Sequence, residues 1–213
     1  MAAPTRAIFW DNDGVLVETE HLYFQATQET LASIGIALTR EDYIALFLVE
    51  GRGAWHIAQQ RGVAQPEIER LRNDRNARYS ELLAQTTRVI AGVTDVLDAL
   101  HGRYVMGVVT SSRKDHFDVI HRNTGLLKYF DFVLTASDVT RVKPDPEPYV
   151  RAVARSGVPA DACIAIEDSA RGLESARAAG IGCIVVPTDL TRQSDFAGAD
   201  RVLANIGELL RVL

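Results

Sequence analysis

The 213-residue sequence has only two cysteines, no long apolar run and no excess of positive charge. Cys163 and Cys183 each begin a short apolar run, which predicts packing residues and no disulfide framework. No apolar run approaches the roughly 20 residues that span a bilayer. Residues 1–6 are too short and polar to precede the apolar core of a secretory signal peptide. A formal net charge of -5 offers no basic surface for nucleic acid or acidic membranes. We therefore expect a cytoplasmic protein without nucleic-acid or membrane partners.

Short β-branched runs alternate with amphipathic segments over most of the chain. The expected strands cover residues 7–10, 105–109, 132–134, 164–166, 182–186 and 202–203. Helices, with apolar residues at three- and four-residue spacing, are expected at residues 94–101, 114–124, 147–156 and 172–179. This alternation predicts an α/β fold, in which helices cover both faces of a Rossmann-like, doubly wound parallel sheet.

One segment, residues 19–83, interrupts the alternation with successive helices and no convincing strand. The expected helices cover residues 22–34, 40–48, 54–61 and 66–83, and glycines separate them. The segment predicts an inserted α-helical cap domain of residues 18–86 within a core domain of residues 1–17 and 87–213. Two short crossings between the domains are typical of a hinge.

Two aspartates follow the first expected strand. Asp11 and Asp13 are separated by one residue and followed by Gly14. Open α/β folds bind ligands at the carboxyl ends of their strands, and alternate side chains of an extended segment point the same way. Asp11 and Asp13 could therefore address one cation or one reacting atom. A loop with two solvated aspartates is the alternative.

Two further segments carry hydroxyl groups and an ammonium that could contact a phosphate group. Thr110, Ser111 and Ser112 follow the expected strand 105–109; such hydroxyls and turn amides can hold phosphate oxygens, although capping a helix is their commoner role. Lys143 begins a segment stiffened by three prolines. A rigidly held ammonium can neutralise a carboxylate nucleophile and a transferring phosphoryl group, and an ordinary surface lysine is the alternative.

Paired carboxylates end a later apolar strand. Glu167 and Asp168 would repel one another unless something compensates, and a hard divalent cation with oxygen ligands does so. An exposed acidic turn is the alternative. Each of these four patterns is weak alone, but all four occur at or just after expected strand ends.

In this order, the four patterns resemble the motifs of the haloacid dehalogenase superfamily. The matching residues are Asp11 to Leu16, Thr110, Lys143 to Asp145, and Glu167 with Asp168, continued by Ser169, Gly172, Ala176, Ala179 and Gly180. The resemblance covers essentially the whole chain. The helical segment is similar to the small cap of the subfamily that contains phosphoglycolate phosphatases and β-phosphoglucomutases.

The resemblance implies a Mg²⁺-dependent phosphoric monoester hydrolase. Asp11 would attack phosphorus and form an aspartyl-phosphate, and Asp13 would act as general acid and then as general base. The implied metal ligands are Asp11, Asp13 through its peptide carbonyl, Glu167 and Asp168. The implied contacts to phosphate oxygens are Thr110, the amides near Ser111, and Lys143.

Specificity is expected to come from the cap. The candidate residues are Tyr23, Glu50, Gly51, Arg52, Arg75 and Tyr79. Arg75 and Tyr79 lie one helical turn apart and could share a face, with a solvated arginine and a packed tyrosine as the alternative. The expected substrate is a small phosphorylated metabolite, such as a sugar phosphate or a phosphoglycolate-like compound. We expect a monomer or a weak homodimer.

A phosphosugar mutase is the alternative function. Mutase relatives carry a proton-transferring histidine in the first cap helix, where this chain has Tyr23, and His21 two residues earlier points to another side of a helix. A metal-free dehalogenase is disfavoured by Asp13. A phosphonatase is disfavoured because residues 19–83 contain no lysine for a Schiff base. A catalytically silent scaffold is disfavoured because all the reacting residues are present.

Two residues depart from the superfamily pattern. Asn12 replaces the aromatic or aliphatic residue that is usual between the two aspartates, and a buried polar side chain there needs a partner of its own. Glu18 stands where most relatives have aspartate, and we expect it to shape the cap junction.

Overall fold

The computed structural model describes residues 4–213. The chain forms two compact units: one runs up to Glu18 and again from Arg88 to Leu213, and the other is Thr19–Thr87. Each boundary lies one residue later than the sequence suggested. Backbone pairing explains this, because the amide of Glu18 donates to the carbonyl of Arg88 (2.9 Å) and Val17 forms a bridge with Val89. These contacts attach both chain segments that connect the two units to the larger unit.

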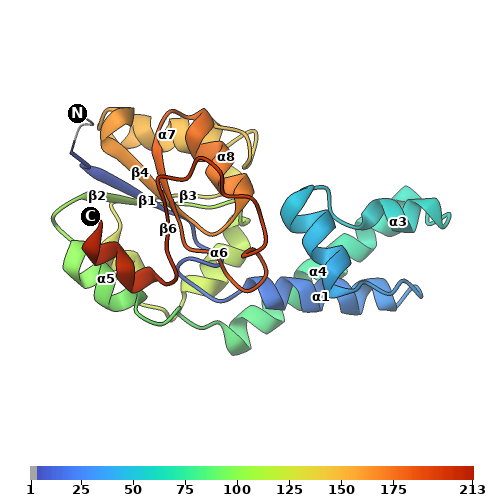
Figure 1. Cartoon of the computed structure of the whole chain (residues 1–213). Helices are drawn as coiled ribbons and strands as arrows, with labels where there is room; N and C mark the ends of the chain where they lie inside the picture. Colours follow the sequence, from blue (N-terminus) through green and yellow to red (C-terminus); the bar gives the residue numbers. More distant parts are fainter. Residues whose placement is uncertain (1–3) are drawn as a thin grey trace. The chain divides into compact units, whose positions relative to one another are not determined.

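The larger unit is built on a sheet whose six described strands are all parallel, in the order β3-β2-β1-β4-β5-β6 (Figure 1). The strands are β1 (Ala7–Trp10), β2 (Val105–Val109), β3 (Phe132–Leu134), β4 (Cys163–Glu167), β5 (Gly182–Val185) and β6 (Arg201–Val202). The chain winds outward from β1 in one direction and then resumes at β4 in the other. The predicted doubly wound parallel sheet is confirmed.

Helices cover both faces of this sheet. Helices α7 (Glu147–Ser156) and α8 (Ala170–Ala178) lie on one face, and α5 (Val93–Leu100) and α6 (Lys114–His121) lie on the other (Figure 1). All four residues of β1 are fully buried, as expected for a central strand between two helical layers. Ala7 and Phe9 pack in the core beneath α7 and α8, and the alternation of a strand directs Ile8 and Trp10 to the other face.

The strand register brings the polar ends of the strands together. Trp10 is level with Val108 in β2 and with Ile166 in β4. The residues that follow, Asp11 and Glu167, therefore lie side by side at the switch point between β1 and β4, where doubly wound folds bind ligands.

Two helix boundaries in this unit differ from the expected ones by more than one residue. Helix α6 ends at His121 instead of Thr124, because the amide of Arg122 donates to the carbonyl of Val119 (3.4 Å), only three residues back, and so tightens the last turn. Helix α8 begins at Ala170 instead of Gly172, because the Ser169 hydroxyl caps it by accepting from the amide of Gly172 (3.2 Å). Short 3-10 helices at Leu126–Tyr129, Ala136–Asp138, Ala160–Ala162 and Ile206–Arg211 gave no sequence signal.

Helices joined by turns and short irregular segments make up the smaller unit. It contains α1 (Glu20–Ala32), α2 (Arg40–Tyr43), the π-helical segment η1 (Ile44–Val49), α3 (Trp55–Gln60) and α4 (Gln65–Thr86). Helix α1 packs along α4, and an ion pair between Arg78 and Glu29 joins them (2.7 Å). The helix expected over residues 40–48 is divided, since η1 widens the turn after Tyr43. Within residues 4–213, we find no helix with the length and apolar character needed to cross a membrane.

Candidate active site

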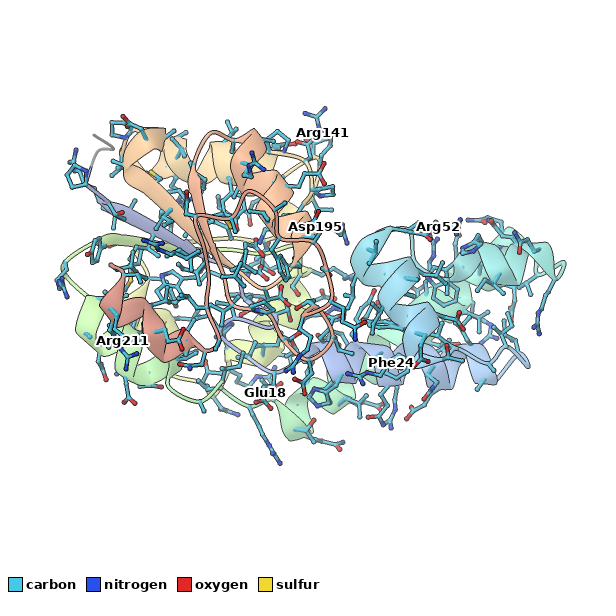
Figure 2. The ribbon with its side chains drawn as sticks, in the orientation of Figure 1. Glu18, Phe24, Arg52, Arg141, Asp195 and Arg211 are labelled. Atoms are coloured by element: carbon cyan, nitrogen blue, oxygen red, sulfur yellow. The ribbon has the colours of Figure 1, made fainter. Side chains whose placement is uncertain are left out.

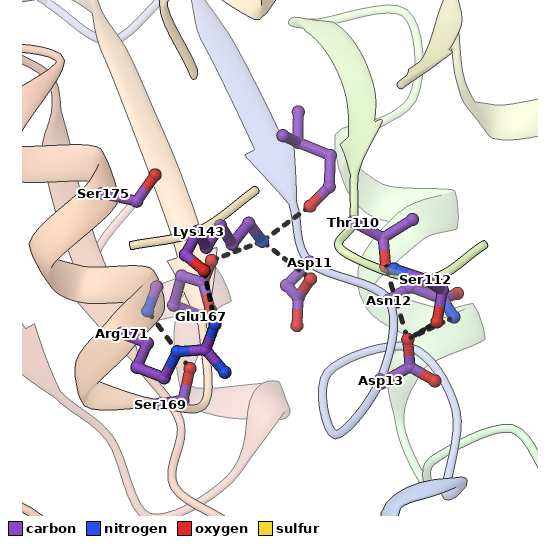
Figure 3. Close-up of polar contacts among 12 residues, drawn as sticks. Asp11, Asn12, Asp13, Thr110, Ser112, Lys143, Glu167, Ser169, Arg171 and Ser175 are labelled. Atoms are coloured by element: carbon purple, nitrogen blue, oxygen red, sulfur yellow. Dashed lines mark hydrogen bonds and ion pairs between the residues drawn. The ribbon is translucent and has the colours of Figure 1, made fainter. Parts of the chain in front are cut away.

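Asp11 lies directly after β1 and is held by a buried lysine (Figure 3). The ammonium of Lys143 donates to Asp11 Oδ1 (2.8 Å) and to the carbonyl of Val109 (2.7 Å), and it lies 2.6 Å from Glu167 Oε1. Both Asp11 and Lys143 are buried. Lys143 thus links the ends of β1, β2 and β4, and the predicted surface-lysine alternative is wrong.

The charges in this cluster shift its titration. Burial by itself would lower the pKa of Lys143, but Asp11 and Glu167 raise that pKa well above its usual value, so the ammonium stays charged. Burial raises the pKa of Asp11 to about 7; Lys143 opposes this rise, and Glu167 adds to it. One ammonium therefore does not fully compensate the carboxylates around it. A further positive charge at this position would stabilise ionised Asp11.

Glu167 is the most enclosed of these carboxylates. It is fully buried, and the hydroxyl of Tyr149 donates to its Oε1 at 2.5 Å. Burial, and then the negative charge of Glu167, raise the pKa of Tyr149 well above its usual value, so this donor keeps its proton. A Cβ atom placed on Gly172 would lie 1.9 Å from Glu167 Oε2, which explains why the start of α8 has a glycine there.

Three carboxylates form a group that could hold a metal ion. Asp11, Glu167 and Asp168 are buried, and each offers an oxygen within 4.8 Å of the others. Glu167 Oε2 is buried and has no hydrogen-bond partner within residues 4–213. Gly14, at φ 82°, brings the backbone close to Asp168, because a Cβ there would lie 2.5 Å from Asp168 Oδ2. An all-oxygen set with surplus negative charge suits a hard divalent cation.

Asp13 faces a different set of partners (Figure 3). Its Oδ2 accepts hydrogen bonds from Ser112 Oγ (2.6 Å), Asn12 Nδ2 (3.2 Å) and Thr110 Oγ1 (3.3 Å). The Asp13 carboxylate is thereby fixed on the β2 side of Asp11, where hydroxyl groups gather.

The expectation that Asp11 and Asp13 address one cation or one reacting atom stays a prediction, although the two aspartates do not lie on one extended segment. Strand β1 ends at Trp10, and the amides of Val15, Leu16 and Val17 turn back onto the carbonyl of Asn12. The segment is thus a tight turn, and the oxygen group around Asp11 does not include the Asp13 carboxylate within the described residues. Ligation through the peptide carbonyl of Asp13 stays a prediction.

The hydroxyls after β2 divide into two kinds. Thr110 is buried and accepts from the amide of Ser112 (2.9 Å), whereas Ser111 is exposed. Ser111 was the hydroxyl residue predicted to bind phosphate, whereas the contact of Ser112 with Asp13 was not predicted, although the run of three hydroxyls was a signal for it. Arg171 was not predicted either; its guanidinium donates to the carbonyl of Lys143 (2.5 Å) and so fixes the backbone that carries the ammonium.

Three of the predicted specificity residues meet in the helical unit. The Arg75 guanidinium lies 4.4 Å from the centroid of the Tyr23 ring, and the Tyr79 ring lies 5.1 Å from it, edge to face. Arg75 and Tyr79 are both buried, so the alternative of a solvated arginine is wrong and that of a packed tyrosine is confirmed. Arg75 Nη1 is buried without a hydrogen-bond partner in residues 4–213. A positive charge held in this way favours an anionic or hydroxyl-rich ligand.

The other predicted specificity residues lie at the surface of the helical unit. Gly51 and Arg52 are exposed, and Arg52 pairs with Glu50 in the segment after η1 (Figure 2). His21 is exposed on α1.

The sequence matches the family of haloacid dehalogenase-like hydrolases over residues 8–186. The chain belongs to this family. The matched span contains all four motifs, so the predicted superfamily is confirmed.

Relatives and solved structures agree with this assignment. The protein CbbY of Rhodobacter capsulatus is 32% identical over 92% of this chain and 91% of its own. Fructose-1-phosphate phosphatase YqaB of Escherichia coli is 29% identical over 84% of this chain and 95% of its own. The crystal structure of CbbY from Rhodobacter sphaeroides in complex with phosphate matches with a TM-score of 0.82 and 30% identity, over 96% of each chain. These likenesses support the prediction of a phosphoric monoester hydrolase.

Proposed function

We propose that this protein is a Mg²⁺-dependent phosphatase that hydrolyses a small phosphorylated metabolite through an aspartyl-phosphate on Asp11. The observation that carries the proposal is the arrangement around Asp11. Lys143 and an oxygen-rich group lie on one side, and Asp13, held by hydroxyls, lies on the other. Membership of a hydrolase family and a relative named as a phosphatase support it.

In the first step, a carboxylate oxygen of Asp11 attacks phosphorus, and the bond from phosphorus to the leaving oxygen breaks. Asp13 gives its proton to that oxygen, so the product leaves as an alcohol. Lys143 carries positive charge next to the nucleophile and stabilises the developing charge on the phosphoryl group. Bound Mg²⁺, with Asp11, Glu167 and Asp168 as candidate ligands, would supply the charge that screens the nucleophile from the phosphate.

In the second step, water attacks the phosphorus of the aspartyl-phosphate. Asp13, now a carboxylate, removes a proton from this water, and the bond between Asp11 and phosphorus breaks to release inorganic phosphate. General acid–base catalysis of this kind contributes about 10² to 10⁴ in rate.

A single-turnover experiment with p-nitrophenyl phosphate tests the covalent mechanism. Asp13→Asn keeps the nucleophile and lacks the base, so we expect about one equivalent of p-nitrophenolate and a protein that gains the mass of one phosphoryl group. Asp11→Asn conserves volume but lacks the nucleophile, and it should give neither. Hydrolysis at the wild-type rate by Asp11→Asn, with its fold verified by circular dichroism, would exclude the mechanism.

The metal is tested separately. Activity should disappear with EDTA and return with Mg²⁺, and Mg²⁺ alone should raise the melting temperature of the wild type by binding the folded state. Asp168→Asn should lose most of that thermal shift. Full activity in a metal-free preparation would contradict the proposal.

For the substrate, we propose that the residues around Tyr23 contact the part of the metabolite that leaves as an alcohol. Arg75, with its buried and unpartnered Nη1, is the strongest candidate, and Gly51 and Arg52 stay predictions. Arg75→Gln should raise the KM for fructose 1-phosphate by about tenfold and change the KM for p-nitrophenyl phosphate less than twofold. Arg72→Gln, at an exposed position of α4, is the matched control. Equal effects on both substrates would contradict the assignment.

A further inference from the structure

Asn12, the polar residue between the two aspartates, has the buried partner that its position demands. The residue is fully buried, and its side-chain amide is contacted on both sides. The Oδ1 atom lies 2.7 Å from Nε2 of His121, and Nδ2 donates to Oδ2 of Asp13 at 3.2 Å. The amide thus connects a buried imidazole at the end of α6 to the carboxyl that is proposed to transfer protons.

The direction of these hydrogen bonds follows from the ionised form of Asp13, whose carboxylate oxygens can only accept. The amide nitrogen of Asn12 must therefore face Asp13, so its oxygen faces His121. His121 must then carry its proton on Nε2 and donate it to Asn12. The other ring nitrogen, Nδ1, is left to accept from the hydroxyl of Thr124, which lies 2.9 Å away.

The hydrogen bonds of Thr124, on the other side of His121 from Asn12, are consistent with this direction. Thr124 Oγ1 also accepts from the amide of Leu126 (3.4 Å), so its own proton is available for His121. The His121 ring packs against Phe117, with 4.4 Å between the ring centroids. Burial lowers the pKa of His121 to about 4, so the imidazole is neutral near pH 7 and a single tautomer is required. The side chains of Thr124, His121 and Asn12 therefore form a relay of hydrogen bonds in which each side chain has one orientation.

We propose that His121 is a positioning residue, which acts through Asn12 to hold the carboxyl of Asp13 for proton transfer to the leaving group. This inference rests on the proposed phosphatase function. Asn12, Thr110 and Ser112 all donate to Oδ2, so three hydrogen bonds fix this oxygen of the Asp13 carboxyl.

Loss of the relay has a distinct kinetic consequence. Without the donor from His121, the Asn12 amide can turn its carbonyl toward Asp13, which removes one donor from Oδ2 and adds repulsion. Departure of a sugar alkoxide needs a proton, whereas p-nitrophenolate leaves without one. The kcat/KM value reports the first irreversible step, so it should fall for an alkyl phosphate and stay nearly constant for the aryl phosphate.

The experiment compares kcat/KM for fructose 1-phosphate and p-nitrophenyl phosphate. In His121→Leu and in Thr124→Val, the ratio of the first value to the second should fall by about tenfold and by about threefold, respectively. Thr124→Ser restores the hydroxyl and should restore the ratio to within about twofold of wild type. His101→Leu, the same exchange at an exposed histidine, should leave the ratio unchanged.

Several outcomes would overturn the inference. An equal loss on both substrates in Thr124→Val would show a structural role alone, and Thr124→Val decides the matter if His121→Leu does not fold. The tautomer of His121 is also measurable without activity, from the ¹⁵N chemical shifts of its ring, and a proton on Nδ1 would refute the relay. Failure of the wild type to hydrolyse either phosphate, with Nε2 of His121 protonated, would instead refute the proposed function and with it this catalytic role.

Discussion

Lys143 and Glu167 form an ion pair of 2.6 Å in which the glutamate has no exposure to solvent and the lysine side chain is 6% exposed. Such a pair is maintained only when both partners are present, because a lone buried charge costs several kcal/mol. The pair lies beside Asp11, so the same ammonium serves the fold and the nucleophile.

Replacement of this lysine should therefore affect stability and activity together. We expect Lys143→Met to lower the free energy of unfolding by about 3 kcal/mol, because Glu167 and Asp11 lose their shared counter-charge. Turnover should fall by at least about 10³-fold. Urea titration and p-nitrophenyl phosphate hydrolysis measure the two effects. Lys114→Met removes an exposed lysine, and its unfolding free energy should change by no more than about 0.5 kcal/mol. A stability of Lys143→Met equal to that of this control would contradict the interpretation.

Gly172 should tolerate no side chain. A Cβ at this position would lie 1.9 Å from Glu167 Oε2, and the fully buried glutamate has little space to retreat. Gly172→Ala should lower the free energy of unfolding by about 2 kcal/mol through overpacking and should also weaken Mg²⁺ binding, measured as a smaller thermal shift. Gly207→Ala, where the nearest such contact is 3.2 Å, is the control. An unchanged thermal shift in Gly172→Ala would show that Glu167 has no part in metal binding.

His121 should make the fold sensitive to mild acid. Its folded pKa is about 4, below the ordinary value of 6.5, because burial disfavours the imidazolium. The unfolded chain therefore binds a proton before the folded one does. The contribution of neutral His121 to the free energy of unfolding is fully present above pH 6.5. Up to about 3 kcal/mol of it is lost as the pH falls toward 4. Urea titrations of wild type and His121→Gln should differ most at neutral pH and converge in acid. Parallel curves, like those expected for exposed His101→Gln, would contradict this.

Much of the fold was predictable because it follows from local patterns. Each expected strand lies within one or two residues of an observed one, since apolar β-branched runs between polar turns are a local signal. Helix ends were less predictable, because they depend on single residues. The tightened turn at Arg122 ends α6 early, and the Ser169 cap starts α8 two residues before the expected position.

The candidate site was predictable in its motif residues and unpredictable in the contacts between them. Asp11 and Glu167 were identified because each lies at a strand end, and the register brings those ends together. Lys143 was identified from the proline-stiffened segment that it begins. The partner of Asn12 lies 109 residues further along the chain, at the end of a helix, and no local pattern connects the two. Such long-range hydrogen bonds follow from packing. The sequence therefore indicated that Asn12 needs a partner, but it could not identify His121 as that partner.

Whether the enzyme is a phosphatase or a phosphosugar mutase depends on proton transfer in the helical unit. The tyrosine at the position of the mutase histidine, Tyr23, packs under the Arg75 guanidinium. Burial raises the pKa of the Tyr23 hydroxyl above its usual value, so it is protonated near neutral pH and cannot serve as a base. His21 is exposed two residues away, on another side of α1. Neither residue is suited to activate a second sugar hydroxyl.

We therefore predict that glucose 1-phosphate, if it is consumed, yields inorganic phosphate in equal amount, without glucose 6-phosphate and without a bisphosphate activator. A mutase must shield its aspartyl-phosphate from water until a second hydroxyl is in place, whereas a phosphatase lets Asp13 activate water at once. Phosphate and glucose 6-phosphate are measured in the same reaction, and Tyr23→Phe serves as the control because it removes only the hydroxyl. Phosphate release should persist in this variant. The phosphatase function would be contradicted if glucose 6-phosphate appeared many times faster than phosphate in the wild type and was lost in Tyr23→Phe. That result would indicate a mutase in which Tyr23 transfers the proton.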